Sequence, residues 1–122
     1  MEIGKTNRLK AARTTEFGFF LVDEEGNEVL LPNAYVSEEL KLDDEIDVFI
    51  YRDSENRIVA TTLKPYVELE EFAYLKVNQV NKFGAFLDWG LLKDLMVPFS
   101  EQNERMEEGN SYVIFMFMDE SS

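Results

Sequence analysis

Apolar and polar residues alternate in short stretches along this chain, and most stretches end at glycine, proline, asparagine or aspartate. In residues 45–52, for example, Ile46, Val48 and Ile50 fall on one face of an extended chain. A period of two is typical of a strand with one buried face. The pattern predicts strands over residues 9–14, 16–23, 28–31, 45–52, 57–63, 72–80, 82–88, 94–97 and 111–118.

This pattern occurs twice, at a constant offset of 66 residues. The run Phe17-Gly18-Phe19-Phe20-Leu21 returns as Phe83-Gly84-Ala85-Phe86-Leu87, and Val29-Leu30-Leu31-Pro32 returns as Leu95-Met96-Val97-Pro98. Self-similarity at a fixed offset indicates a repeated unit. We predict two tandem domains, residues 1–65 and 66–122, joined near Lys64-Pro65-Tyr66.

Turn signals separate the predicted strands. Gly26 suits the left-handed position of a tight hairpin, and Pro32 ends the third strand because proline cannot donate to a ladder. Ser37 could cap one helical turn over residues 37–40, with a similar turn near Ser100. Five short strands with one small helical element between the third and fourth are the plan of an oligonucleotide/oligosaccharide-binding (OB-fold) barrel. The predicted fold is all-β, with two tandem five-stranded OB-fold barrels.

The second copy lacks a counterpart of the closing strand, residues 57–63, because the sequence stops at Ser122. Its fourth strand, residues 112–118, is apolar on both faces, whereas the first copy places Asp47 and Arg52 there. An unpaired apolar strand recruits another chain. We therefore expect either a fragment of a longer protein or a cover over residues 112–118, foremost a homodimer through that edge.

Composition narrows the classes of function. A hydrophobic content of 45% is typical of a globular chain. The absence of cysteine and histidine excludes disulfides, thiol chemistry and the common zinc sites, so we expect no cofactor. The sequence has no apolar run of membrane-spanning length and no leader-like start, and we expect a cytoplasmic protein without membrane contact.

The net charge of −13 argues against general nucleic-acid binding. Residues 1–65 hold 8 basic and 14 acidic side chains, and residues 66–122 hold 4 and 11. Affinity for a phosphate backbone comes mostly from lysine and arginine. Any nucleic-acid role must therefore rest on a local patch.

Several strings resemble known families. Phe-Gly-x-Phe-Leu, a turn, an apolar pair and Asp-x-x-x-Arg-Ile resemble the S1 (S-one) RNA-binding domain. Leu30-Leu31-Pro32, Ala60-Thr61-Thr62 and the runs 83–91 and 93–102 are similar to the amino-terminal half of the conserved virulence factor B family. This resemblance covers essentially the whole chain, and it implies tandem S1 domains of an RNA-binding regulator of gene expression. In that family a further such domain and a winged helix follow.

The resemblance also implies an RNA face. It maps onto Phe17, Phe20, Asp53 and Arg57 in the first copy and onto Phe83, Phe86 and Asp119 in the second. The histidine that many such domains carry in the third strand is replaced by Pro32 and Pro98.

The aromatic and basic candidates each have a structural alternative. Exposed rings let bases stack, but phenylalanine is usually buried. Strict alternation puts Phe17 and Phe20 on opposite faces unless the chain bulges near Gly18. Arg57, with Lys10 and Arg52 as neighbours, could hold phosphates, or it could pair with Asp53 across the turn.

The acidic cluster and Trp89 each have a functional and a structural interpretation. The carboxylates Asp43, Asp44, Glu45 and Asp47 could converge on a metal for phosphodiester cleavage, but a solvated turn is favoured. Trp89 could be a base platform, although packing between the copies is favoured. Without a histidine-containing triad or a glycine-rich phosphate loop, catalysis has no visible apparatus, and we expect no enzyme.

Two functions remain. The first is a noncatalytic module that binds single-stranded RNA on a shallow barrel face. The second is an acidic protein-interaction or architectural module that binds a protein partner or positions RNA-binding domains elsewhere. The charge favours the second function, whereas the resemblance favours the first, which we prefer.

Overall fold

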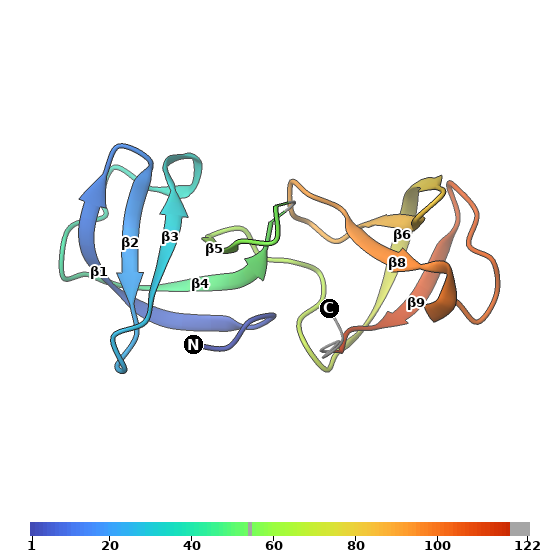
Figure 1. Ribbon diagram of the computed structural model, residues 1–122, viewed down its shortest axis with the longest axis horizontal. Helices are drawn as coiled ribbons and strands as arrows, with labels where there is room; N and C mark the ends of the chain where they lie inside the picture. The colour runs from blue at the N-terminus through green and yellow to red at the C-terminus, as the bar shows by residue number, and fades with distance from the viewer. Residues whose placement is uncertain (54, 118–122) are drawn as a thin grey trace. The chain divides into compact units, whose positions relative to one another are not determined.

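A computed structural model describes residues 1–53 and 55–117 (Figure 1). The chain divides into two compact units, Met1–Lys64 and a second that begins at Pro65. Strands and two single-turn 3-10 helices make up the regular structure of the described residues, so the all-β prediction is confirmed. The same residues contain no helix long and apolar enough to cross a membrane.

The first unit is a closed five-stranded barrel with the strand order β1-β2-β3-β5-β4 (Figure 1). Its elements are β1 (Thr6–Thr15), β2 (Gly18–Val22), β3 (Glu28–Pro32), the 3-10 helix η1 (Asn33–Tyr35), β4 (Glu45–Arg52) and β5 (Ile58–Thr61). β1 is long enough to pair with both β2 and β4. β5 closes the barrel because it pairs with β4 antiparallel and with β3 parallel.

Alternate residues of these strands fill the barrel. The core cluster consists of residues with at most 3% of their surface exposed: Leu9, Ala11, Leu21, Val29, Leu31, Val48, Ile50 and Ala60. Burying one Val, Leu or Ile side chain contributes about 1.5–3 kcal/mol. The predicted inward face of the fourth strand is therefore confirmed at Val48 and Ile50. The direction of these two side chains fixes the face of β4 that points outward.

The second unit is a four-stranded sheet with the order β8-β7-β6-β9. Its elements are β6 (Phe72–Asn81), β7 (Gly84–Asp88), β8 (Leu95–Pro98), the 3-10 helix η2 (Phe99–Glu101) and β9 (Ser111–Phe115). β8 and β9 are its two edges, and the described residues provide no strand between them, as the missing closing strand predicts. β9 was expected to reach Met118, but it ends at Phe115, and Met118 lies outside the described residues.

The offset of 66 holds in the backbone as well as in the sequence. Each of β1, β2, β4 and η1 begins 66 residues before its counterpart β6, β7, β9 or η2. Asp43 and Gly109 share a positive φ, of 72° and 85°. The repeat therefore extends to the turn before β4 and β9, whereas the turn after β2 differs, since Gly26 has a positive φ and its counterpart Leu92 does not.

The sequence left open a bulge near Gly18, which would place Phe17 and Phe20 on one face. The bulge lies instead in β1, between Ala11 and Arg13, and β2 pairs regularly with β3 at Gly18. Gly18 has φ +147°, and a Cβ there would lie 2.1 Å from the Leu31 carbonyl oxygen, so glycine is needed for close approach of β2 and β3.

The helical element also differs from the expected one. It spans Asn33–Tyr35 and has no side-chain cap. Residues 37–40 form a turn in which the Leu40 amide donates to the Ser37 carbonyl at 3.2 Å. η2 at Phe99–Glu101 is also uncapped by a side chain, although it includes the predicted Ser100.

Candidate nucleic-acid interface

The turn between β1 and β2 presents the first candidate, Phe17. It lies just before β2 rather than within it, and 66% of its surface is exposed. Its backbone is held from both sides, because its amide donates to Thr15 Oγ1 at 3.2 Å and its carbonyl accepts from the Asn33 amide at 3.0 Å. The Asn33 side chain also donates to the Glu16 carbonyl at 2.7 Å. An exposed ring on a fixed backbone is a ready stacking surface.

Phe20 lies on the outer face of β2 and is half-buried. It stands opposite Arg13 of β1 and Leu30 of β3. The Arg13 guanidinium carbon lies 4.0 Å from the ring centroid, which is cation–π geometry. The Nε of Arg13 also donates to Glu28 Oε2 at 3.0 Å. Phe20 is thus outside the barrel core, and a cation partly covers its ring.

Sequence reasoning did not identify Arg13. The repeat comparison selects residues that both copies share, and the counterpart of Arg13 at the offset of 66 is Gln79. The bulge in β1 places Arg13 directly opposite Phe20. That register depends on the pairing of two strands, and no signal in the sequence indicates it.

Asp53 and Arg57 lie in the turn between β4 and β5 and bind each other. Arg57 Nη2 lies 2.9 Å from Asp53 Oδ2, and a second carboxylate, that of Glu55, lies 3.1 Å away. The backbone hydrogen bond from Arg57, followed by its side-chain hydrogen bond, lowers the pKa of Asp53. The pairing alternative is therefore confirmed, and a phosphate would have to compete with two carboxylates for Arg57.

Other cations of the first unit also have acceptor partners. Lys10 Nζ lies 3.6 Å from Asp43, and Arg8 lies within 3.6 Å of both Glu45 and Asp47. Arg52 Nη1 donates to the Asn56 carbonyl at 3.3 Å. Phosphate binding at these positions would require exchange of an existing partner.

The second unit repeats the aromatic pair with a different neighbour. Phe83 is 62% exposed, its amide donates to Asn81 Oδ1 at 2.8 Å, and Lys82 Nζ lies 5.1 Å from its ring centroid. Phe86 is half-buried on the outer face of β7, opposite Gln79 and Met96. Gln79 cannot supply the cation that Arg13 brings to Phe20. Asp119 lies outside the described residues.

Trp89 is not a base platform. Only 4% of its surface is exposed, and its indole Nε1 donates to the Lys93 carbonyl at 2.6 Å. A buried ring offers no face to a base, so that reading is wrong. Trp89 is therefore a buried structural residue.

The acidic residues near the start of β4 are exposed, as the solvated-turn reading predicts. Asp44 Oδ2 accepts from the Lys41 amide at 3.0 Å, and Glu45 and Asp47 face Arg8. Over residues 1–53 and 55–117, no three acidic side chains converge as metal ligands would.

The closed barrel, with aromatic residues at the start and on the outer face of β2, defines an OB-fold protein of the S1 type. Residues 3–63 and 71–122 both match the model of the S1 domain family. The chain belongs to the S1 domain family, and each copy of the repeat is one such domain.

Curated relatives support the resemblance noted in the sequence. The chain is 37% identical over 98 residues to "Uncharacterized protein YitL" of Bacillus subtilis (strain 168), covering 80% of this chain and 33% of the relative. It is 27% identical over 85 residues to "Conserved virulence factor B" of Staphylococcus epidermidis, covering 68% and 28%. The counterpart from Staphylococcus saprophyticus is 26% identical over 78 residues, covering 62% and 26%. The similarity to conserved virulence factor B is confirmed, and this chain spans a third or less of these relatives.

A solved structure shows the same fold. It is a multidomain protein with nucleic acid binding domains from Streptococcus pneumoniae TIGR4, which superposes with a TM-score of 0.78 at 20% identity. The similarity covers 98% of this chain and 43% of that protein.

Proposed function

We propose that this chain is a noncatalytic nucleic-acid-binding module that binds single-stranded RNA, principally on its first unit. The observation that carries this proposal is the Phe17 ring, 66% exposed on a backbone held by Thr15 and Asn33. A rigid, exposed ring stacks on any base, and each stacked base contributes about 1–3 kcal/mol. Membership of the S1 domain family supports the same function.

Phe20 and Arg13 would form the second part of the face. A guanidinium 4.0 Å above a ring presents a planar cation on which a further base can stack. Arg13 can also approach a phosphate if Glu28 releases it. The dominance of stacking over ion pairing fits a chain with a net charge of −13.

The second unit would bind RNA more weakly. Phe83 and Phe86 repeat the aromatic positions, but Gln79 replaces Arg13.

In the first unit, Asp53 would orient Arg57. Arg57 would contribute no more than one phosphate contact, because it already pairs with two carboxylates. Replacing Arg57 should therefore lower the salt dependence of RNA binding by at most about one phosphate contact.

The proposed biological role is regulation of gene expression in the cytoplasm, as a part of a larger RNA-binding protein. It rests on the similarity to conserved virulence factor B, whose family the sequence resembles. The solved relative with nucleic acid binding domains supports nucleic acid as the ligand class.

Titration of the chain with short single-stranded RNA tests this function. Phe17→Ala should weaken binding by about 1–3 kcal/mol, because one stacked base is lost. Leu42→Ala is a matched control, since Leu42 is also exposed in the first unit but lies outside the proposed face. Equal affinities of wild type and Phe17→Ala would remove Phe17 from the interface.

A second function, an acidic protein-interaction module, is favoured by one specific observation. The net charge is −13, and Lys5, Arg8, Lys10, Arg13 and Arg57 each lie within 4.0 Å of a carboxylate. Such a module would bind a basic protein but not RNA. Competition between a lysine-rich peptide and RNA for the labelled chain separates the two functions.

A further inference from the structure

The outer side of β6 and β9 in the second unit presents aromatic and apolar side chains to solvent. Phe72 and Tyr74 of β6 are 72% and 71% exposed, and Val113, which pairs with Tyr74 from β9, is 68% exposed. The Phe115 ring supports the Phe72 ring, with 4.6 Å between their centroids. Lys76 is the next exposed residue of β6 on this side. We call Phe72, Tyr74, Lys76 and Val113 the β6–β9 face.

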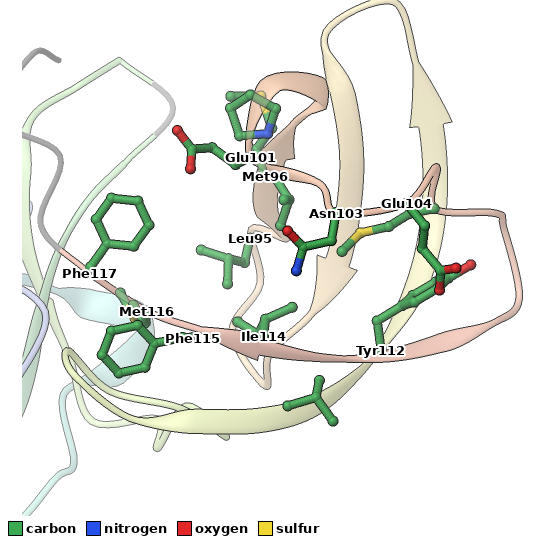
Figure 2. A pocket seen from close by; sticks show the side chains of 14 residues that line it. Leu95, Met96, Glu101, Asn103, Glu104, Tyr112, Ile114, Phe115, Met116 and Phe117 are labelled. Carbon is green, nitrogen blue, oxygen red and sulfur yellow. The ribbon is translucent and has the colours of Figure 1, made fainter.

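This face lies on the opposite side of the sheet from its apolar interior. Successive residues of a strand point to opposite sides. Ile114, between Val113 and Phe115, lies on the inner side of β9, where it faces Leu95 across a groove (Figure 2). Phe115 is not counted in the face, because its counterpart Phe49 is buried in the first unit.

The first unit carries charges at the same positions. Tyr74 corresponds to Arg8 of β1 at the offset of 66 residues. Val113 corresponds to Asp47 of β4, whose Oδ1 lies 3.3 Å from Nη1 of Arg8. The side chains of Arg8 and Asp47 are 59% and 61% exposed, although β5 pairs with β4. A fifth strand therefore leaves this part of the sheet open to a ligand.

Lys76 has lost the carboxylate that its counterpart holds. In the first unit, Lys10 Nζ lies 3.6 Å from Asp43. In the second copy, Gly109 stands at the position of Asp43. Asp88, which pairs with Lys76 from β7, accepts a backbone amide at 3.0 Å instead. Among the described residues no carboxylate lies within 4.0 Å of Lys76, so its charge is available to a phosphate.

A second cation lies close to Tyr74. Arg105 and Tyr74 line the same hollow, which has a volume of about 410 Å³. Over residues 1–53 and 55–117, Arg105 also has no carboxylate within 4.0 Å. Glu104 and Glu107 line the hollow as well, so stacking should contribute more to binding there than phosphate contacts do.

We propose that the β6–β9 face is a second contact surface for single-stranded RNA, with one base stacked on Tyr74 and another on Phe72. Residues two apart on one side of a strand lie about 6.7 Å apart, so the two rings form consecutive platforms. An apolar protein segment would leave Lys76 and Arg105 without an anion, whereas an RNA strand supplies both bases and phosphates. Repulsion between two chains of charge −13 disfavours a second copy. This inference rests on the proposed function for its ligand and adds a surface to it.

NMR titration of the full chain with short single-stranded RNA at low salt tests this surface. We expect saturable shifts at residues 72–76 and 111–115, in addition to those around Phe17. Tyr74→Ala should weaken the binding measured at residues 72–76 by about fivefold or more, because one stacked base is lost. Tyr74→Phe keeps the ring and should restore most of this loss.

Two further variants separate the face from its surroundings. Val113→Asp brings a carboxylate beside Tyr74 and should weaken binding about fivefold by repelling phosphate. The first copy carries Asp47 at this position, so the sheet should accept the change. Leu92→Ala is the matched control, because Leu92 is 79% exposed but lies between β7 and β8, outside the face, and binding should be unchanged.

The titration also distinguishes failure of this surface from failure of the proposed function. Shifts around Phe17 without shifts at residues 72–76 would overturn the β6–β9 face and leave RNA binding by the first unit standing. No shifts at either place would overturn both. Equal affinities of Tyr74→Ala and wild type at residues 72–76 would exclude stacking on Tyr74. Shifts of residues 72–76 on dilution of the chain alone would assign the face to a second copy, and shifts with a lysine-rich peptide but not with RNA would assign it to a protein partner.

Discussion

The two units follow one sequence pattern, yet the first closes into a barrel and the second remains an open sheet. Three strands of each unit, its 3-10 helix and two of its positive-φ turn positions correspond at an offset of 66 residues. The difference lies in β5, which buries the side chains of β3 and β4. Four short strands therefore suffice to set the local backbone, but a fifth is needed to complete the core.

Truncation at matched core positions should show the largest difference between the units. Leu31→Ala in the closed barrel should lower the free energy of unfolding by about 2–5 kcal/mol, because Leu31 is fully buried. Val97→Ala at the matched position should cost about 1 kcal/mol or less, since Val97 is half-buried. Hydrogen exchange read residue by residue measures each unit separately. Equal losses would contradict the open core of the second unit.

The glycines at the start of β2 and β7 offer a second comparison. Gly18 and Gly84 have φ of +147° and +151°, and a Cβ would lie 2.1 Å from the Leu31 oxygen or 2.4 Å from the Val97 oxygen. Gly18→Ala should cost about 3 kcal/mol or more, because β3 is held between two strands and cannot move away. Gly84→Ala should cost about 1–2 kcal/mol, because β8 is an edge strand that can shift. Urea denaturation of the two variants checks the order, and the reverse order would refute it.

Much of the fold could be predicted because the same strand pattern occurs in both copies of the repeat. The alternation around Ile46, Val48 and Ile50 and the paired Phe-Gly runs located the strands and the missing closing strand. The bulge in β1 could not be located, since it depends on how Ala11 and Arg13 align with another strand. The burial of Trp89 likewise depends on its tertiary neighbours.

The candidate site was predicted less completely than the fold. Phe17 and Phe83 are exposed, but the motif alone left stacking and core roles open. Arg57 matches the family motif, yet its guanidinium already forms ion pairs with Asp53 and Glu55. Arg13 was missed because only one copy carries it. Sequence similarity thus identified the positions that the two copies share, whereas the ion pairs of the arginines could be seen only in the structure.

The Asp53–Arg57 pair predicts an acid-sensitive contribution in the first unit. Hydrogen bonds from Arg57 lower the pKa of Asp53 from its ordinary value of 3.8. Because the pKa of Asp53 is lower in the folded than in the unfolded state, its carboxylate stabilises the folded state at pH values above the unfolded-state pKa. This stabilisation is lost as the pH falls through the folded-state pKa. Below about pH 4, the first unit of wild type should therefore lose stability more steeply than that of Asp53→Asn. Urea denaturation across pH 2–6 measures this difference in stability, and the effect is small because Arg57 is exposed to solvent. Parallel pH profiles would show that the pair contributes nothing.

The direct test of RNA binding is an NMR titration of the chain with short single-stranded RNA at low and at moderate salt. Binding at low salt should first perturb residues around Phe17, Arg13 and Phe20, and only at higher RNA concentration those around Phe83 and Phe86. Moderate salt should weaken it only modestly, because stacking dominates over phosphate contacts. The absence of binding at low salt, or shifts confined to the second unit, would contradict the account.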